Sequence, residues 1–202
     1  MRSYQLYQQA FGDYQTNCYI LQKKEGEIII DPGIGASEWV NAICKNPLAI
    51  LNTHGHFDHI WSNATLKQQY PHIPIVIHTE DSFMLQQDCF SLGQPICSPT
   101  LEITQEEKRL EFDGFSLQYI HFPGHTPGCC VIVCEDSMFS GDFIFYRSIG
   151  RYDFPYSSAK QMQESLQKFK QIAEDKILYP GHGQKSSIFA EQKNIDLWIR
   201  CF

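Results

Sequence analysis

The chain has 202 residues, of which 43% are hydrophobic and 19% charged, as in an ordinary globular protein with a substantial core. Its formal net charge is −7 and no basic run exceeds two residues, so nucleic acid and membrane surfaces are not expected partners. The first residues lack the apolar segment of a signal peptide, and no apolar run approaches membrane-spanning length. We therefore expect one cytoplasmic domain over residues 1–202, with reduced and mostly buried cysteines.

The first half of the chain predicts several strands and then an alternation of helix and strand. Pro32 and Gly33 stop the third strand, so that Asp31 lies at its carboxyl end. Ser37 fits the N-cap of the first helix, and Thr79 that of the third. The expected strands are 4–11, 16–22, 27–30, 48–52 and 74–78, and the expected helices are 37–45, 58–70 and one that starts near 80.

The second half repeats this order after a loop over 88–99, which is a candidate cover for the site. Asp113-Gly114 indicates a tight hairpin between two of its strands. The expected strands are 108–112, 115–121, 129–134, 137–140 and 176–179. A helix capped by Ser157 or Ser158 and a terminal helix over 188–200 bury apolar faces formed by Met162, Leu166, Phe169 and Ala173, and by Ile188, Ile195, Trp198 and Ile199.

Two successive halves of this kind pack most simply as two mixed β-sheets face to face with helices outside. We therefore predict an α/β fold, a four-layer αββα sandwich.

Potential metal ligands are concentrated in Thr53-His54-Gly55-His56-Phe57-Asp58-His59. The segment joins a predicted strand to a predicted helix, where α/β proteins commonly build their sites. His54 and His56 point the same way in extended backbone, while Asp58 and His59 lie at the helix start. Imidazole and carboxylate groups favour a borderline divalent cation such as Zn²⁺.

Three later loops, each directly after a predicted strand, supply further candidate ligands. They are Pro123-Gly124-His125-Thr126-Pro127-Gly128, Ser140-Gly141-Asp142 and Pro180-Gly181-His182-Gly183. Each is a weak signal alone, but strand ends at one sheet edge can converge. The remaining histidines, His72, His78 and His121, lack such settings and are interpreted as structural or surface residues.

The seven candidates are enough for two cations. One cation would take His54, His56 and His125, the other would take Asp58, His59 and His182, and Asp142 would bridge them. Two cations about 3.5–4 Å apart can share a hydroxide that is available as a nucleophile near neutral pH.

His-x-His-x-Asp-His followed by Gly-His-Thr-Pro-Gly, Ser-Gly-Asp and Gly-His-Gly resembles the metallo-β-lactamase superfamily. The likeness extends from Asn17-Cys18-Tyr19-Ile20 to the last of these motifs, and 148–155 resembles the short bacterial members of the glyoxalase II branch. The resemblance implies an αββα sandwich with a binuclear site, occupied by zinc or alternatively by iron or manganese. It also implies hydrolysis of S-acylglutathione thioesters such as S-lactoylglutathione, a small-molecule substrate.

In this mechanism Asp58 binds metal and orients the nucleophile, and Asp31 braces the ligand loop as a hydrogen-bond acceptor. Candidate substrate contacts are Tyr146, Arg151 and Tyr152, and Arg151-Tyr152-Asp153 stands where the family has a Lys-Phe-Tyr segment. We expect Arg151 to hold a substrate carboxylate and Asp153 to point elsewhere, toward Arg151. Only about 20 residues follow His182, so we expect no separate C-terminal helical domain for glutathione.

Several alternatives stay open at this point. A persulfide dioxygenase with one iron would use much the same ligand pattern, and lactone or β-lactam hydrolysis occurs in the same superfamily. A non-enzymatic metal-storing module is the alternative of a different class. A flavodiiron-type reductase would want Glu in place of His56 and a flavin domain. The sequence does not indicate an oligomeric state.

Overall fold

Two six-stranded sheets form the centre of the computed structural model, which describes residues 2–202. The first sheet has the order β1-β2-β3-β4-β5-β6, with antiparallel pairing from β1 to β3 and parallel pairing from β3 to β6. Its strands are β1 (Gln5–Phe11), β2 (Thr16–Gln22), β3 (Glu27–Ile30), β4 (Pro47–Leu51), β5 (Ile75–His78) and β6 (Leu101–Ile103).

The second sheet has the order β14-β13-β10-β9-β8-β7, and only its β10–β13 pair is parallel. Its strands are β7 (Glu107–Phe112), β8 (Phe115–His121), β9 (Cys130–Cys134), β10 (Ser137–Gly141), β13 (Ile177–Pro180) and β14 (Ser186–Ser187). A small hairpin, β11 (Ile144–Phe145) and β12 (Ser148–Ile149), lies in the aromatic loop that follows β10.

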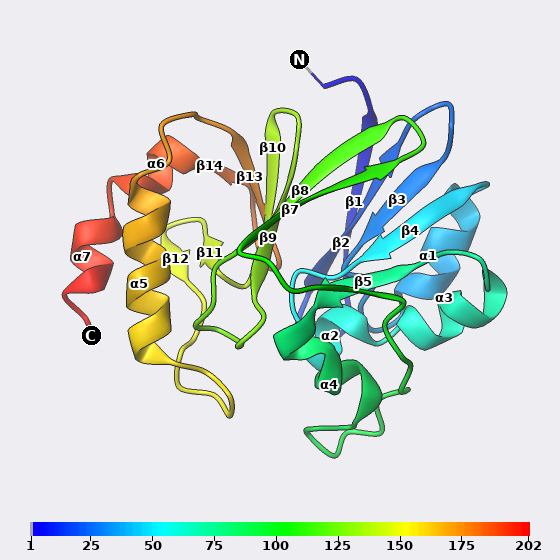
Figure 1. Ribbon diagram of the computed structural model, residues 1–202, viewed down its shortest axis with the longest axis horizontal. Coiled ribbons are helices and arrows are strands. Elements are labelled where there is room, and N and C mark those ends of the chain that lie inside the picture. The colour runs from blue at the N-terminus through cyan, green and yellow to red at the C-terminus, as the bar shows by residue number, and fades with distance from the viewer. Residues whose placement is uncertain (1) are drawn as a thin grey trace.

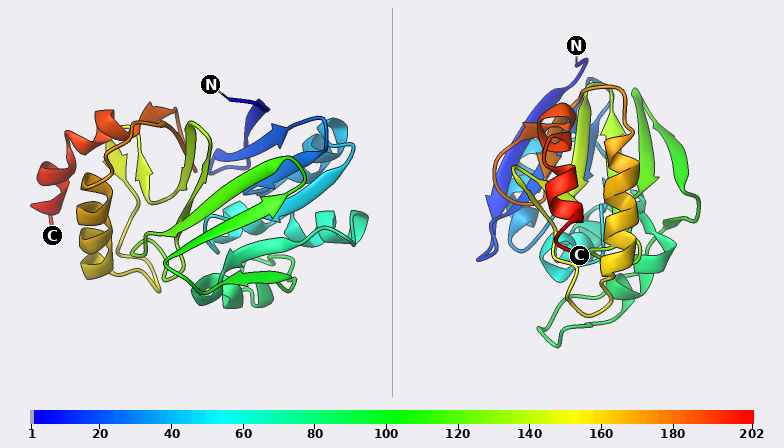
Figure 2. Two further views of the ribbon diagram at one scale, coloured as in Figure 1. Left: turned by 45° about the horizontal axis from the view of Figure 1, so that its top comes forward. Right: turned by 90° about the vertical axis from the view of Figure 1, so that its left-hand side faces the viewer.

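Helices cover the outer faces of both sheets, so the molecule has four layers (Figure 1). α1 and α3 cover the first sheet, while α5, α6 and α7 cover the second (Figures 1 and 2). The helices are α1 (Ala36–Ile43), α2 (Phe57–Ile60), α3 (Asn63–Gln69), α4 (Ser82–Gln86), α5 (Ala159–Lys170), α6 (Ile188–Gln192) and α7 (Ile195–Ile199). The predicted αββα sandwich is confirmed.

Three apolar clusters hold these layers together. The central cluster joins the inner faces of the two sheets and includes Leu21, Leu117 and Phe139. The other two lie between each sheet and its own helices. Strands β3 and β5 are buried along their whole length because both of their faces are covered, which explains the apolar runs Ile28-Ile29-Ile30 and Ile75-Val76-Ile77 within them.

Local details correct several expectations for the first half. The first helix begins at Ala36, after Gly35 in a left-handed conformation with φ 83°, so Ser37 lies inside the first turn instead of capping it. The expected 58–70 helix is two helices, because Ser62 donates hydrogen bonds to the carbonyls of Pro32 (3.0 Å) and Gly33 (2.6 Å).

Further corrections concern strand β5 and the end of the chain. Thr79 lies inside a 3₁₀ turn, Thr79–Asp81, and the side chain of the preceding His78 caps this turn instead. Strand β6 has no clear sequence signal, because two of its three residues are exposed at the sheet edge. Ser158 caps α5 as expected, but α5 ends at Lys170 and leaves Ala173 exposed. The expected terminal helix is divided into α6 and α7, with Trp198 and Ile199 only half-buried.

Across residues 2–202 the structure holds no helix with the length and apolarity needed to cross a lipid bilayer.

Replacing Leu117 by alanine tests the contribution of the central cluster. Leu117 is 1% exposed, so its truncation removes buried methyl groups and should lower the free energy of unfolding by about 2–5 kcal/mol. The same change at Leu197, which is 62% exposed, should cost less than about 0.5 kcal/mol. Urea unfolding of both variants makes the comparison, and equal losses would contradict this assignment of the core.

Candidate metal centre

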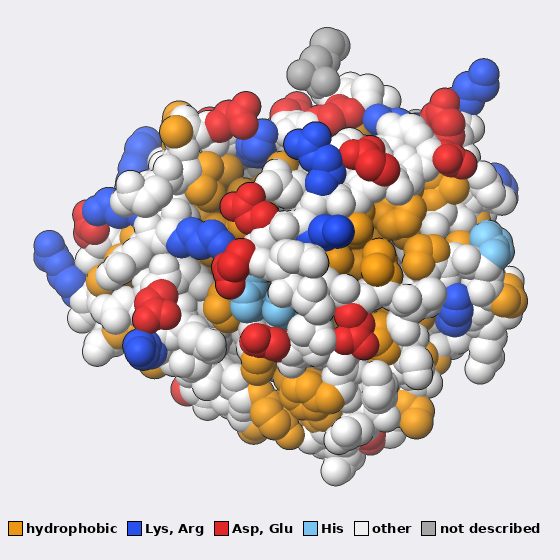
Figure 3. Space-filling view, viewed as in Figure 1, with side chains coloured by type: hydrophobic (Ala, Val, Ile, Leu, Met, Phe, Trp, Pro, Cys, Tyr) orange, Lys and Arg blue, Asp and Glu red, His pale blue; other side chains and the backbone are white. Residues whose placement is uncertain are grey.

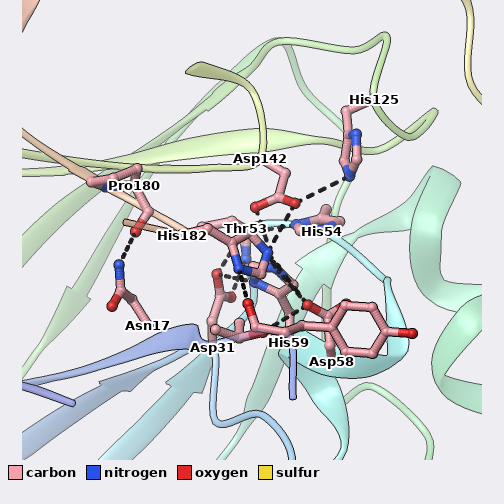
Figure 4. A network of polar contacts seen from close by, with 12 residues as sticks. Asn17, Asp31, Thr53, His54, Asp58, His59, His125, Asp142, Pro180 and His182 are labelled. Carbon is pink, nitrogen blue, oxygen red and sulfur yellow. Dashed lines mark hydrogen bonds and ion pairs between the residues drawn. The ribbon is translucent and has the colours of Figure 1, made fainter. Parts of the chain in front are cut away.

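The seven predicted ligands meet at one edge of the sandwich, in the seam between the two sheets. Figure 4 labels all of them except His56. His54 and His56 follow β4, and Asp58 and His59 belong to α2. The others come from the loops after β8, β10 and β13, which carry His125, Asp142 and His182. The weak individual signals therefore do converge, because each loop leaves its strand at the same edge.

Their side chains form two groups of three. The candidate ligand atoms of His54, His56 and His125 lie within 4.8 Å of one another, and those of Asp58, His59 and His182 do the same. This is the division expected from the sequence. The first group offers three imidazole nitrogens and the second offers two imidazole nitrogens and a carboxylate oxygen, which are donors that divalent transition metals bind.

The Asp142 carboxylate lies between these groups. Its Oδ2 is 3.5 Å from Nε2 of His125 in one group and 3.3 Å from Nε2 of His182 in the other. Its Oδ1 is 3.3 Å from Nε2 of His59. One carboxylate therefore faces both groups, as a bridging ligand must.

Unpartnered polar atoms show that the residues fit a metal. Within residues 2–202, Nε2 of His54, His56 and His125 and Oδ1 of Asp142 are buried without a hydrogen-bond partner. Buried polar groups are nearly always paired, and leaving one unpaired costs about 1–3 kcal/mol. The three nitrogens belong to the first group and the oxygen faces the second, so these unpartnered atoms are donors that cations would satisfy.

The first group is electrically neutral. Burial lowers the pKa of His54 well below its usual value and that of His56 to about 3, and burial also lowers the pKa of His125. At neutral pH these imidazoles keep free lone pairs, which is the protonation state that metal binding requires.

The second group has a different electrostatic character. Burial alone would raise the pKa of Asp58, but His59 and hydrogen bonds from His182 and Thr16 lower it to about 2. Burial would lower the pKa of His182, but the carboxylates of Asp142 and Asp58 raise it to about 9. The two carboxylates therefore attract positive charge, which protons supply when no cation does.

Asp31, the predicted brace of the ligand loop, lies behind this centre at the end of β3. Its Oδ2 accepts a hydrogen bond from Nδ1 of His59 (3.0 Å), which leaves Nε2 of that ring turned toward the centre. It also accepts from the backbone N–H of Thr53 (2.8 Å) and from its hydroxyl (2.6 Å). One buried carboxylate thus orients a ligand ring and anchors the start of the His54 loop.

Asp81 performs a similar task that the sequence did not reveal. It is fully buried and accepts hydrogen bonds from the N–H of Gly55 (2.8 Å), the N–H of Gly128 (2.6 Å) and the hydroxyl of Thr126 (2.6 Å). These partners flank His54, His56 and His125, so Asp81 ties the two loops of the first group together. The sequence signal available for Asp81 was its position shortly after a strand, which it shares with Asp142.

The His182 loop is anchored by β2 and by the turn that precedes it. The Asn17 side chain donates to the carbonyls of Pro180 and Gly183, both at 3.0 Å. Nδ1 of His182 donates to the carbonyl of Tyr14 (2.9 Å), which turns Nε2 toward Asp142. Gly181 is required here because a Cβ would overlap Oδ1 of Asp142.

A pocket of about 680 Å³ opens over the centre. Arg151 lines it, but Tyr146 lines a separate hollow beside α6 and α7, and the Tyr152 ring packs on Phe202. The positions of these two tyrosines therefore do not support the predicted substrate contact. The pocket is lined instead by residues that are mostly aromatic, namely Tyr14, Phe57, Phe90, Phe145, Ile149, Phe154 and Pro155, beside the ligands and Arg151.

The other histidines lie outside the centre. His72 is exposed, while His78 and His121 stack with their ring centroids 4.0 Å apart. Nε2 of His121 donates to the carbonyl of Pro127 (2.8 Å), which supports the His125 loop from behind. This agrees with the structural role predicted for His121.

The family model of the metallo-beta-lactamase superfamily matches residues 11–182. The chain belongs to this superfamily. The centre is accordingly a dinuclear metal-binding site of the superfamily's His/Asp type.

Individual relatives are similar to this chain over most of their own length. Hydroxyacylglutathione hydrolase GloC of Haemophilus influenzae is 31% identical, with 90% of this chain and 92% of GloC covered. The BLEG-1 B3 metallo-beta-lactamase has a TM-score of 0.84 at 31% identity, covering 94% of this chain and 97% of its own. TTHA1623 in a di-iron-bound form has a TM-score of 0.76 at 30% identity, covering 92% and 96%.

Replacing Asp81 by alanine tests its positioning role. Without the carboxylate, the N–H groups of Gly55 and Gly128 lose their buried acceptor, so the loops of the first group loosen. We expect zinc affinity to fall about 10–100-fold, as measured by competition with a chromophoric chelator. Asp88→Ala is the matched control, because this half-buried aspartate accepts hydrogen bonds from the backbone of its own loop. Unchanged affinity in Asp81→Ala would contradict the bracing role.

The two groups should bind cations with different pH dependence. His182, whose pKa is about 9, and His59, whose pKa Asp58 and Asp142 raise well above its usual value against the effect of burial, must each lose a proton before binding metal. Affinity at the second group should therefore rise by up to about a hundredfold per pH unit between pH 6.5 and 8. Binding at the first group should change little, because burial keeps the pKa of His56 near 3. Stepwise zinc titration of metal-free protein resolves both events, and parallel slopes would contradict the assignment.

Proposed function

We propose that the protein hydrolyses S-acyl thioesters of the S-acylglutathione type at a pair of divalent cations. The observation that carries this proposal is the Asp142 carboxylate, which faces both ligand groups at 3.3–3.5 Å. A shared carboxylate between two sets of three ligands is the arrangement of a two-cation hydrolytic site. The 31% identity to the relative named hydroxyacylglutathione hydrolase GloC supports the thioester class.

The chain's own residues prepare this chemistry. Bound cations supply a hydroxide near neutral pH and polarise the substrate carbonyl. His54, His56, His125 and Asp142 would hold the first cation, and Asp58, His59, Asp142 and His182 the second. Asp31 and Asp81 keep the imidazoles aimed by accepting hydrogen bonds from their rings or their loops.

Asp58 orients the nucleophile in this proposal. Its Oδ2 accepts a hydrogen bond from the Thr16 hydroxyl (2.7 Å) and lies 3.4 Å from Nε2 of His182. The pKa of about 2 keeps Asp58 ionised at neutral pH, so it can accept a hydrogen bond from the attacking oxygen. A thiolate is a good leaving group, so the reaction needs no strong general acid.

Two other activities, β-lactam hydrolysis and persulfide oxidation, can be distinguished from thioester hydrolysis by experiment. BLEG-1 carries the name of a B3 metallo-beta-lactamase, and its TM-score of 0.84 makes β-lactam hydrolysis a second candidate. A persulfide dioxygenase would instead use one iron and consume oxygen. A substrate panel with oxygen uptake separates these reactions from thioester hydrolysis.

The proposal predicts turnover of S-lactoylglutathione after reconstitution with zinc, iron or manganese, measured beside acyl-CoA analogues, a β-lactam and glutathione persulfide. Asp58→Asn should lower kcat for the thioester at least about 100-fold, because it removes the negative charge that orients the nucleophile. Asp196→Asn, an exposed change in α7, is the matched control. Oxygen uptake on the persulfide without thioester hydrolysis, or an unchanged kcat in Asp58→Asn, would contradict the proposal.

A further inference from the structure

The wall of the pocket over the metal centre is apolar to an extent that the hydrolytic chemistry does not require. The Phe90 ring lies 5.5 Å from the ring of His56, and the Phe154 ring lies 5.9 Å from it, measured between centroids. On the opposite side of the centre, Phe145 lies 6.0 Å from His182 and Tyr14 packs on Phe57 at 5.3 Å. Aromatic rings thus flank both ligand groups.

The charge of Arg151 is already neutralised. Arg151 is the one lysine or arginine among the pocket-lining residues of the described chain. Its guanidinium makes two hydrogen bonds of 2.9 Å to Asp153 and lies 4.0 Å from the centre of the Phe154 ring. Its charge is therefore paired with Asp153, and its planar face extends the aromatic surface.

Part of the apolar wall reaches the molecular surface. Phe154 is 37% exposed and Tyr14 is 59% exposed, and elsewhere Phe83 packs on the half-exposed Tyr156 at 5.1 Å between ring centroids. The space-filling view shows a further group of hydrophobic side chains at the lower margin of the face drawn (Figure 3). Such a surface favours the part of a substrate that carries no charge.

We propose that this pocket selects thioesters whose acyl group bears an apolar ring beside the scissile carbonyl. The proposal rests on the thioesterase function and adds the identity of the acyl group. Phe90 and Phe154 are the specificity-determining residues, because they contact His56, a ligand of the first group, and lie next to the reacting centre. Burying a ring against them, instead of a methyl group, removes apolar surface from water in the complex and in the transition state.

The matched substrates are S-mandeloylglutathione and S-lactoylglutathione. They share the leaving group and the hydroxy acid, and differ by a phenyl ring in place of a methyl group. We expect kcat/KM to be at least about tenfold higher for the mandeloyl thioester with the zinc-loaded protein.

Phe90→Ala should bring the ratio of the two kcat/KM values toward one, mainly by lowering the mandeloyl value. Phe189→Ala, on the exposed face of α6, is the matched control and should leave the ratio unchanged.

Binding of the product acids gives a readout that needs no turnover. Mandelate should bind the zinc-loaded protein about tenfold more tightly than lactate in calorimetric titration, and Phe90→Ala should remove the difference. A kcat/KM ratio near one in the wild type, or equal affinities for the two acids, overturns the inference. If neither thioester is hydrolysed but mandelate still binds more tightly, the thioesterase proposal fails while the apolar pocket stands.

Discussion

The structure depends on a buried concentration of charge in the seam between its two sheets. Asp58 and Asp142 are each 8% exposed and are surrounded by the rings of five histidines. Burying carboxylates is costly unless opposite charge compensates them. Without a cation that charge comes from protons on the second group, such as that of His182, because the imidazoles of the first group are neutral. Divalent cations would compensate the charge of the carboxylates and bind the unpartnered nitrogens. The groups whose burial calls for a cation are therefore the groups that would carry the chemistry.

Residues outside the candidate ligand set fix the positions of the ligand side chains. Asp31 orients the His59 ring, Asp81 joins the loops of the first group, and Asn17 anchors the loop of His182. Each of these side chains belongs to a different strand or to the turn after it. The sheets therefore act as the rigid frame on which flexible loops become a fixed ligand set.

The clustering of the candidate ligands was predictable because each lies shortly after a strand whose apolar sequence is plain. The continuous apolar runs of β3 and β5 and the hairpin at Asp113-Gly114 likewise indicated the sheets. The break between α2 and α3 was not predictable, because it depends on hydrogen bonds from Ser62 to carbonyls about thirty positions earlier. Asp81 and the packing of Tyr152 on Phe202 were missed for the same reason, since only tertiary contacts give them their roles.

The pocket adds a constraint that the ligand pattern does not contain. Phe90 belongs to the irregular 88–99 segment, which carries no motif. Phe154 lies in the 148–155 segment, whose family likeness does not reveal that its ring is beside His56. Superfamily members with similar ligands can therefore differ in substrate through such loops, while the metal chemistry stays the same.

The shared position of Asp142 is tested most directly by anomalous X-ray diffraction from crystals of the zinc-loaded protein. The account predicts two anomalous peaks per chain, about 3.5–4 Å apart, with the Asp142 carboxylate in contact with both. A single peak held by His54, His56 and His125, or two peaks of which Asp142 touches only one, would contradict it.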